Sequence, residues 1–382
     1  MKQKEPKKLL VIRLSAFGDV AMTAPVVTLL ASQYPHLRIT LLTRARFQPL
    51  FEWMPANVEV KGINPDDYKG IAGLTRLYSQ LSAYGFDSVA DLHDVLRTKY
   101  LRTLFHLAGK KVAVIDKERK QRRALIGHGV TAPALKPMFQ RYADVFSQLG
   151  FNISLPAGED LNEVSPRPIG ERGLWREAFS HEDFIPIHAF AGKKNPGDKW
   201  IGIAPFAAHP MKIYPLDQMR LTANMLLEKG YKVFLFGAGR EESEELATWE
   251  CGDMRSVCGQ LGGLHNELLL ISRLDLMICM DSANMHLAAM LGIPTLSIWG
   301  ATHPKAGFTA WQQTDLNILQ DPTLPCRPCS IYGSKPCRFN DQRCMAGITP
   351  EVIVERAEQL LTISQPHNLT PPSASGTHQS VR

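Results

Sequence analysis

The chain has 382 residues, 45% of them hydrophobic and 21% charged, a composition typical of a soluble globular protein, and its length predicts two domains. No apolar run is long enough to cross a bilayer, and the run after the basic first residues is too short for a signal peptide, so we expect a cytoplasmic protein. The formal net charge of +6 suits an anionic partner such as a nucleotide, a phosphorylated glycan or a membrane surface.

The first half of the chain alternates short apolar runs with stretches of helical spacing. The apolar runs, each predicted to form a buried parallel strand, are 8–14, 38–44, 86–93 and 111–117. The stretches between them with helical spacing include 19–35, 75–85 and 98–109. This alternation predicts a doubly wound α/β domain over residues 1–190.

A second stretch of the same kind begins after a break. Residues 191–200 are rich in Gly, Pro and Lys without an apolar face, which is typical of a linker. The alternation then restarts, with predicted strands at 200–206, 231–238, 276–281 and 294–300, and predicted helices at 215–230, 240–249, 266–275 and 283–292. We therefore predict a second α/β domain over residues 201–348.

The end of the chain has two parts. Residues 349–364 predict a C-terminal helix in which Thr349 is the N-cap and Pro350 occupies the first helical position. Residues 365–382 are polar and rich in Pro and Ser, which predicts a disordered tail.

One candidate binding site follows a predicted strand of the second domain. Asp281 ends strand 276–281, and the small residues Ser282 and Ala283 precede a helix with His286 in its first turn. Free amides at a helix N-terminus can bind a diphosphate, and Asp281 could accept a hydrogen bond from a sugar hydroxyl. The same residues could serve only to cap the helix, and the sequence leaves both interpretations open.

Two other strand ends carry charged side chains. Lys212 is the only cation close to the end of strand 200–206, where it could neutralise a leaving phosphate or remain a solvated surface lysine. After strand 231–238, Glu242 occupies the third glycine position of a dinucleotide fingerprint, which disfavours a dehydrogenase. Glu241 or Glu242 could accept hydrogen bonds from ribose hydroxyls, or could only stabilise the helix start.

Asp19 lies where the first strand gives way to the first helix, beside Gly18. A glycine there permits a tight loop and the close approach of a ligand, and a carboxylate in the first turn of a helix is stabilised as the anion. If Asp19 faces a cleft, it could take the proton of an attacking hydroxyl. It could equally serve only to start the helix, and the sequence does not choose.

Cationic side chains gather in two stretches of the first domain, 92–102 and 116–125. Arg97, Lys99 and Arg122 are the candidates there for a basic rim that binds an anionic acceptor or membrane headgroups, with a solvated face as the alternative. Aromatic residues do not alternate with these cations, so nucleic acid is disfavoured as a partner.

Four of the seven cysteines lie within one short segment. They are Cys326, Cys329, Cys337 and Cys344. Their spacing leaves a structural zinc site and unligated thiols equally open. No histidine interrupts the group, which disfavours a catalytic zinc with an open position.

Four stretches together resemble glycosyltransferase family 9, the ADP-heptose:lipopolysaccharide heptosyltransferases. They are 11–27 (VIRLSAFGDVAMTAPVV), 91–99 (DLHDVLRTK), 205–215 (PFAAHPMKIYP) and 280–304 (MDSANMHLAAMLGIPTLSIWGATHP). The resemblance covers nearly all of residues 7–363. It implies a GT-B fold, in which two Rossmann-like domains face a central cleft, the first binding the acceptor and the second the nucleotide sugar.

The resemblance also implies a role for each candidate residue. Asp19 would be the general base, Lys212 would bind the donor phosphates, and the ribose would contact Glu241 or Glu242. The residues implied to contact the rest of the donor are Asp281, the amides of Ser282 and Ala283, and His286. Family members invert the anomeric centre without a metal, so we expect that catalysis requires no cofactor and that any zinc is structural.

We therefore predict an inverting, metal-independent transferase that moves a heptose from ADP-heptose to a lipopolysaccharide core or lipid-linked glycan acceptor, in peripheral contact with the inner membrane. The same fold acting on another nucleotide sugar or glycan acceptor is one alternative. A non-catalytic nucleotide-sugar-binding protein is another.

Overall fold

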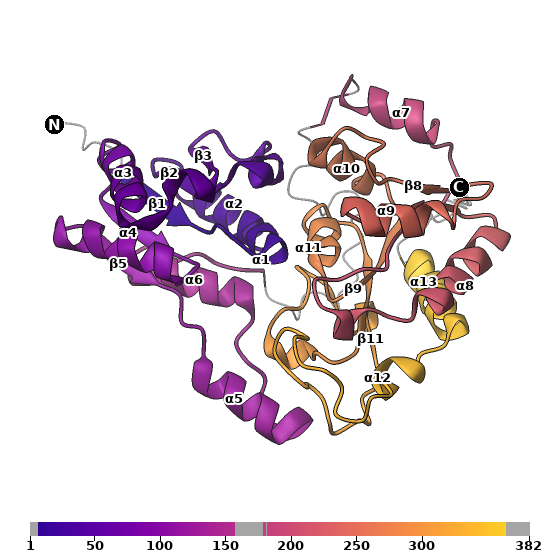
Figure 1. The fold of residues 1–382 in the computed structure, drawn as a ribbon. Helices are drawn as coiled ribbons and strands as arrows, with labels where there is room; N and C mark the ends of the chain where they lie inside the picture. The colour runs from indigo at the N-terminus through magenta and orange to yellow at the C-terminus, as the bar shows by residue number, and fades with distance from the viewer. Residues whose placement is uncertain (1–6, 157–178, 181, 364–382) are drawn as a thin grey trace, which may run out of the picture.

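The computed structural model describes residues 7–156, 179–180 and 182–363. The predicted tail, 365–382, lies outside the described residues. Two parallel sheets, each flanked by helices, form two halves that meet near the middle of the molecule (Figure 1). The predicted α/β class with two doubly wound sheets is confirmed. Among the described residues, no helix combines the length and hydropathy needed to span a membrane.

The first sheet has the strand order β3-β2-β1-β4-β5, and every neighbouring pair is parallel. Its strands are β1 (Lys8–Ile12), β2 (Arg38–Arg44), β3 (Val58–Ile63), β4 (Ser88–Asp91) and β5 (Lys111–Val114). All four strands predicted for this half form. The sequence analysis missed β3 because, as a half-exposed edge strand, it mixes charged with apolar residues and lacks a continuous apolar run.

Helices connect these strands. They are α1 (Phe17–Ala21), α2 (Thr23–Gln33), α3 (Gly70–Ser82), α4 (Leu96–Leu107), α5 (Arg119–His128) and α6 (Met138–Gln148). The helix predicted over 19–35 is in fact two helices, α1 and α2, which are divided at Met22. The first of them begins at Phe17, so that Asp19 lies in its first turn.

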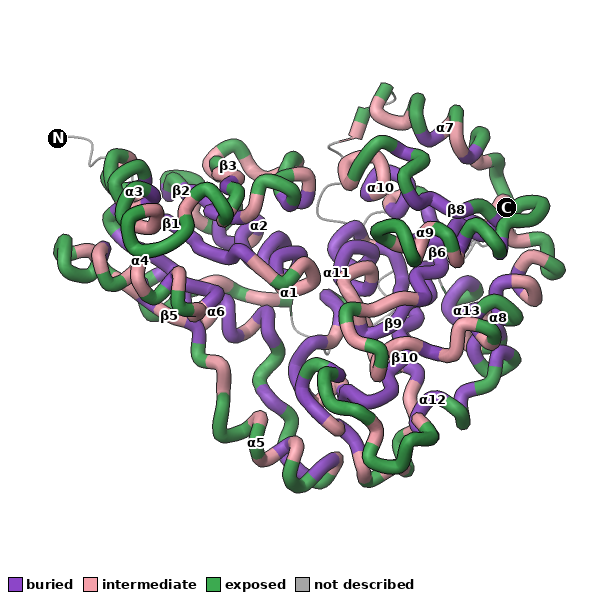
Figure 2. The backbone as a smooth tube through the Cα atoms, in the orientation of Figure 1, coloured by how far each residue is buried: buried purple, intermediate pink, exposed green. Residues whose placement is uncertain are grey.

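The second sheet has the order β11-β10-β9-β6-β7-β8 and is also parallel. Its strands are β6 (Trp200–Ala204), β7 (Lys232–Leu235), β8 (Met254–Ser256), β9 (Leu276–Met280), β10 (Thr295–Trp299) and β11 (Ile318–Gln320). The two edge strands, β8 and β11, were not predicted, since three residues are too few to show a period. The central strands β6, β9 and β10 are completely buried (Figure 2), which explains why apolar residues predominate in their sequences.

The helices of the second half are α7 (Ile185–Ala191), α8 (Leu216–Glu228), α9 (Gly239–Ala247), α10 (Leu264–Ile271), α11 (Ala283–Met290), α12 (Arg343–Ala346) and α13 (Pro350–Ile363). Although α7 precedes the predicted linker, it packs against α10 in this half (Figure 1). Arg255 and Lys232 also donate hydrogen bonds to the carbonyls of Phe190 and Ala191. The domain boundary at residue 190 remains a prediction, and α7 itself lies with the second sheet.

The two halves contact each other in two places. Helix α1 lies against α11, as Figure 1 shows, and one buried hydrophobic cluster includes residues of both sheets. The segment between α5 and α6 reaches the second half, where Leu135 N–H donates to the Lys305 carbonyl (2.8 Å) and Met138 N–H to the Gly307 carbonyl (2.9 Å). These contacts fix the carboxyl ends of the two sheets opposite each other.

Candidate functional site

A cavity of about 600 Å³ lies between the two halves. Most of its lining comes from the segments that follow four parallel strands: 16–22 after β1, 206–212 after β6, 236–242 after β7 and 281–287 after β9. Ligands of open parallel sheets bind at such carboxyl ends. The cavity is therefore the candidate active site, and both halves contribute to it.

Asp19 faces this cavity from the first turn of α1. Its Oδ2 atom lies 2.5 Å from an Nη2 of Arg13 and accepts a hydrogen bond from Ala16 N–H at 3.3 Å. The Asp19 side chain is 18% exposed. The carboxylate thus stabilises the helix start and is also accessible from the cavity, so the two interpretations that the sequence left open are compatible.

Arg13, which the sequence analysis did not single out, orients this carboxylate. Its side chain is only 7% exposed and also donates to the Leu92 carbonyl at 2.5 Å. A buried guanidinium requires partners for its charge and its donors, and Asp19 supplies the charge. The sequence contained a signal for this role of Arg13. An arginine inside the apolar run 8–14 must find a buried acceptor when that run becomes a strand.

Lys212 and Asp281 meet on the opposite side of the cavity. Lys212 lies in the short 3₁₀ helix η8 (Pro210–Lys212) and Asp281 directly follows β9. The Lys212 Nζ and an Asp281 Oδ2 are 2.9 Å apart, and the two side chains are 14% and 8% exposed. The structure therefore brings together two residues that the sequence places 69 positions apart (281 − 212).

The N-terminus of α11 opens into the same cavity. Ser282 is its N-cap residue, and the buried Ser282 hydroxyl has no hydrogen-bond partner in the described part of the chain. Ala283 and Asn284 continue the lining. An unpaired hydroxyl beside free helical amides suits an anion as ligand.

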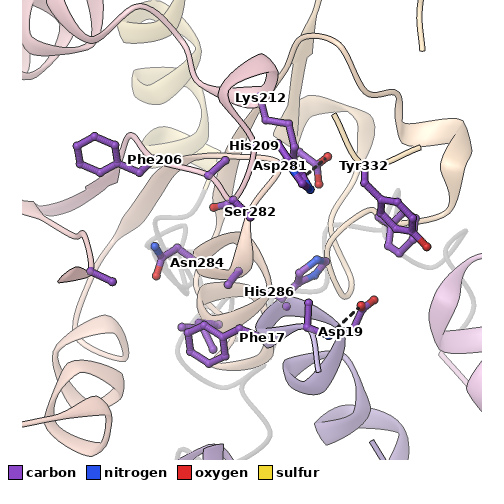
Figure 3. A pocket seen from close by; sticks show the side chains of 18 of the residues that line it. Phe17, Asp19, Phe206, His209, Lys212, Asp281, Ser282, Asn284, His286 and Tyr332 are labelled. Atoms are coloured by element: carbon purple, nitrogen blue, oxygen red, sulfur yellow. Dashed lines mark hydrogen bonds and ion pairs between the residues drawn. The ribbon is translucent and has the colours of Figure 1, made fainter. Parts of the chain in front are cut away.

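His286 lies between the two groups of charged residues, as Figure 3 shows. Burial lowers the pKa of His286 to about 4, so the ring is neutral at physiological pH. A Cβ placed on Gly18 would be 3.0 Å from the His286 Cδ2. The glycine therefore permits the close approach of α1 to α11, whereas the sequence analysis connected it with the approach of a ligand.

The two candidate ribose-binding acids differ in position. Glu242 lines the cavity and accepts a hydrogen bond from Ala238 N–H at 2.7 Å. Glu241, one residue earlier on α9, is exposed and is not part of the lining. Glu267 on α10 is a further acid of the lining that the sequence analysis missed, and burial raises the pKa of its carboxyl.

Of the three predicted acceptor-binding cations, Arg122 lines one of two cavities beside Asp19, and the other two line neither. Arg122 on α5 lines a smaller cavity beside Asp19 and donates a hydrogen bond to the hydroxyl of Tyr332 in the second half. Lys99 instead lies 3.9 Å from Asp94, and Arg97 lines neither of these two cavities. The position of these side chains depends on how α4 and α5 pack, which the charge pattern does not reveal.

The four bunched cysteines are all free thiols. Burial raises the pKa of Cys344 to about 11, which keeps this thiol protonated. Within residues 7–156, 179–180 and 182–363, no group of three or more His, Cys, Asp or Glu side chains is arranged to hold a metal ion. The arrangement of these four cysteines in the structure is not that of a zinc site. The structural zinc site therefore remains a prediction from the sequence.

Comparison with known proteins identifies the family. The model of "Glycosyltransferase family 9 (heptosyltransferase)" matches residues 74–337, which is more than half of the chain. The chain belongs to glycosyltransferase family 9. The predicted family and the predicted activity as a glycosyltransferase are thereby confirmed.

Individual relatives match this family 9 glycosyltransferase over most of its length. Lipooligosaccharide heptosyltransferase 2 of Haemophilus influenzae is 28% identical over 370 residues, covering 92% of this chain and 99% of the relative. Two solved structures share the fold. A family 9 glycosyl transferase from Veillonella parvula has a TM-score of 0.68 at 19% identity, covering 94% of this chain and 98% of that one. The ADP-heptose lps heptosyltransferase II of Escherichia coli has a TM-score of 0.64 at 21% identity, covering 93% and 98%.

The predicted GT-B architecture of the glycosyltransferase is confirmed by these neighbours. The roles of its individual residues remain predictions. The geometry adds that Asp19, Lys212, Asp281, Ser282, Ala283, Glu242 and His286 all line one cavity, while Glu241, Arg97 and Lys99 do not.

Proposed function

We propose that this glycosyltransferase moves a heptose from ADP-heptose to a sugar hydroxyl of a lipopolysaccharide core, with inversion at the anomeric carbon and without a metal ion. The names of its relatives support the sugar and the acceptor. The observation that carries the mechanism is the position of Asp19 on one wall of the cavity of about 600 Å³ and of the Lys212–Asp281 pair on the other.

The donor diphosphate is expected at the N-terminus of α11. There the amides after Asp281, the unpaired hydroxyl of Ser282 and the ammonium of Lys212 converge. A diphosphate that contacts Lys212 satisfies this charge in place of Asp281, whose carboxylate can then accept hydrogen bonds from sugar hydroxyls. Glu242, in the first turn of α9 after β7, is in place to accept hydrogen bonds from the ribose.

In the proposed reaction, an acceptor oxygen forms a bond to the anomeric carbon while its proton passes to the Asp19 carboxylate. The bond between the anomeric carbon and the β-phosphate oxygen breaks, and ADP leaves with the electron pair. Lys212 and the α11 amides stabilise the negative charge that develops on the diphosphate. Because the base and the leaving group lie on opposite walls, attack comes from the face opposite to ADP, which inverts the anomeric configuration.

Lys212 is the reason for proposing a reaction without a metal. Its ammonium is 14% exposed and lies at the N-terminus of α11, so the protein itself supplies a fixed positive charge where the diphosphate is expected. A side chain held in place before the reaction does not need to reorganise as the charge develops.

The test measures transfer from ADP-heptose to purified core acceptor, with ADP affinity determined separately. We expect Asp19→Asn to lose about 10²-fold or more in kcat, since general-base catalysis contributes about that factor, and to keep its affinity for ADP. Asp217→Asn is the matched control, because Asp217 lies in the first turn of α8 but is exposed and does not line the cavity.

Wild-type turnover by Asp19→Asn would show that another group is the base. Product with a retained anomeric configuration, observed by NMR, would reject the single displacement. If ADP-heptose is not consumed but another nucleotide sugar is, the donor is wrong while the mechanism stands.

A further inference from the structure

The cysteine-rich segment, residues 326–344, returns from the end of the second sheet to the cavity between the halves. It follows β11, and its residues Ile331 and Tyr332 line the cavity of about 600 Å³. Tyr332 lies, like Lys212, on the wall that the second half forms (Figure 3). The proposed reaction uses no residue of this segment, although the segment lies beside Lys212.

Buried hydrogen bonds fix the cysteine-rich segment to the second sheet. Arg327 is completely buried and donates to the carbonyls of Trp299 and Thr302, each at 2.9 Å. Cys329 N–H donates to the Ala301 carbonyl at 2.8 Å. These acceptors lie at the end of β10 and directly after it. The segment cannot shift without leaving buried polar groups unpaired, so it is a rigid part of the cavity wall.

A glycine of this segment lies directly against Lys212. A Cβ added to Gly333 would be 2.5 Å from the Lys212 Cγ and 2.8 Å from its Cδ. Carbon atoms in contact are normally about 3.5–4.0 Å apart, so a side chain at this position would overlap with the lysine. The Lys212 stem therefore occupies the space that a side chain of residue 333 would need.

The ammonium at the other end of the Lys212 stem is held separately. Its Nζ lies 2.9 Å from an Asp281 Oδ2. In the proposed reaction the donor diphosphate replaces Asp281 as the partner of this charge, so the ammonium exchanges one anion for another. The contact with Gly333 is at the stem and is the same with either anion. It therefore restricts where the lysine can move while its partner changes.

Such a restriction has a large effect on a lysine in particular. The side chain is a flexible four-carbon stem, and it loses much rotamer freedom when it is fixed. A stem that is already held in the folded protein loses less of this freedom when the ligand binds, which favours binding. An ammonium that is already in place also stabilises developing charge without reorganisation.

We propose that Gly333 is a positioning residue for Lys212. Because it has no side chain, the rigid backbone of the cysteine-rich segment can hold the lysine stem so that the ammonium reaches the donor diphosphate. Gly333 does not line the cavity itself and acts through Lys212. The proposal rests on the proposed function, since it takes Lys212 as the ligand of the diphosphate. It gives the cysteine-rich segment a part in the reaction, that of a support behind this lysine.

The experiment measures ADP affinity by isothermal titration of the full-length protein and of the variants Gly333→Asn, Lys212→Ala and both combined. Asparagine adds a Cβ and tolerates the left-handed backbone of Gly333, whose φ is 76°. In Lys212→Ala the Cγ and Cδ atoms are absent, and the nearest remaining neighbour of the added Cβ, the Thr302 Cγ2 at 3.6 Å, is in ordinary contact. Gly292→Asn is the matched control, because its φ is 77° and a Cβ there meets no atom within 4 Å.

We expect Gly333→Asn to weaken ADP binding about tenfold, the size expected for one charge-assisted hydrogen bond. Lys212→Ala should weaken it at least as much, and the double variant should bind ADP as Lys212→Ala does. A merely structural role of Gly333 would not give this non-additivity. Gly292→Asn should bind as the wild type does. If Gly333→Asn does not fold, Gly333→Ala, which adds the Cβ alone, takes its place.

The proposal is overturned if Gly333→Asn binds ADP as the wild type does, or if it weakens binding by the same factor with and without the Lys212 side chain. If Lys212→Ala leaves ADP affinity unchanged, it is the proposed role of Lys212 at the donor that fails. A crystal structure of Gly333→Asn then decides on the contact alone. Displacement of the Lys212 ammonium from Asp281 supports Gly333 as its positioning residue, and an unchanged ion pair rejects it.

Discussion

At the scale of single residues, the site depends on charges held in pairs, one where β1 turns into α1 and one between segments that are distant in sequence. Asp19 with Arg13 and Lys212 with Asp281 are each almost fully buried pairs. Burial without a partner would cost several kcal/mol for each ion, so each member requires the other. Because Arg13 holds the Asp19 carboxylate in place, Asp19 can accept the hydrogen bond from Ala16 N–H at the helix start and also line the cavity.

Buried neutral histidines make the stability of the molecule sensitive to pH. His303 is 7% exposed, and burial, with the nearby Arg327 and Lys305, lowers its pKa to about 4. In the unfolded chain its pKa is near 6.5. Below pH 6.5 the unfolded state therefore binds a proton that the folded state does not, and stability falls as the pH falls from 6.5 toward 4.

We predict that His303→Asn makes stability less dependent on pH. His303 Nδ1 accepts a hydrogen bond from Lys305 N–H at 3.0 Å, at the start of the 3₁₀ helix η9 (Pro304–Ala306), and asparagine can do the same. Between pH 7 and 5, the free energy of unfolding should fall by about 2 kcal/mol less in the variant than in the wild type. Urea denaturation at the two pH values measures the free energy of unfolding of both proteins. If this free energy falls equally in the variant and the wild type, the pH dependence does not come from His303.

At the scale of elements, the strands and helices that cover the core follow from local pattern. In α13, Ile353, Ala357 and Leu360 recur at helical spacing and are buried, and the helix packs against α8 and β9. Its start was also predicted. The helix begins at Pro350, and the Thr349 hydroxyl forms a hydrogen bond that lowers the pKa of the Glu351 carboxyl.

We predict that Thr349→Ala destabilises the protein by about 1 kcal/mol, the usual contribution of an N-cap side chain. The measurement is the free energy of unfolding from urea denaturation at pH 7. Thr362→Ala is the control, because Thr362 is exposed at the other end of the same helix and only returns a hydrogen bond to the Glu358 carbonyl within it. Equal losses in the two variants would argue against a capping role.

The strands that were missed are those without a clear pattern. The edge strands β8 and β11 have three residues each, and β3 is half-exposed with a lysine and a glutamate among its residues. Such strands form because a neighbouring strand presents free backbone groups. That cause lies in the tertiary structure and leaves no period in the sequence.

At the scale of the whole molecule, the site exists only because the two halves meet at a fixed distance. Gly18 lies where α1 faces α11, and an added Cβ would be 3.0 Å from the His286 Cδ2 and 3.4 Å from the Ala283 Cα. The His286 ring is buried and cannot easily move aside. The proposed base on α1 and the proposed diphosphate site on α11 are therefore set in position by the same helix contact.

We predict that Gly18→Ala lowers kcat about tenfold or more by separating α1 from α11, because small misplacements of reacting groups are costly. Gly127→Ala on α5 is the control, since a Cβ there meets no atom within 4 Å. Turnover and ADP affinity are measured for both variants. Full activity of Gly18→Ala would mean that the two halves are free to adjust at this contact.

The sequence by itself determined the two α/β halves, the central strands, the capped last helix and the residues that follow the strands, because each of these depends on neighbours within a few positions. The resemblance of the sequence to family 9 indicated Asp19, Lys212 and Asp281 together as residues of one site. The tertiary structure decided which charges face one another, Arg13 with Asp19 and Lys212 with Asp281. It also placed Arg122, but not Arg97 or Lys99, in the lining of the smaller cavity beside Asp19. Arg13 and Asp19 face each other because β1 turns directly into α1, and Lys212 and Asp281 meet because they follow neighbouring strands of the second sheet. Only the folded arrangement brings such side chains within the few ångströms over which charges and hydrogen bonds act.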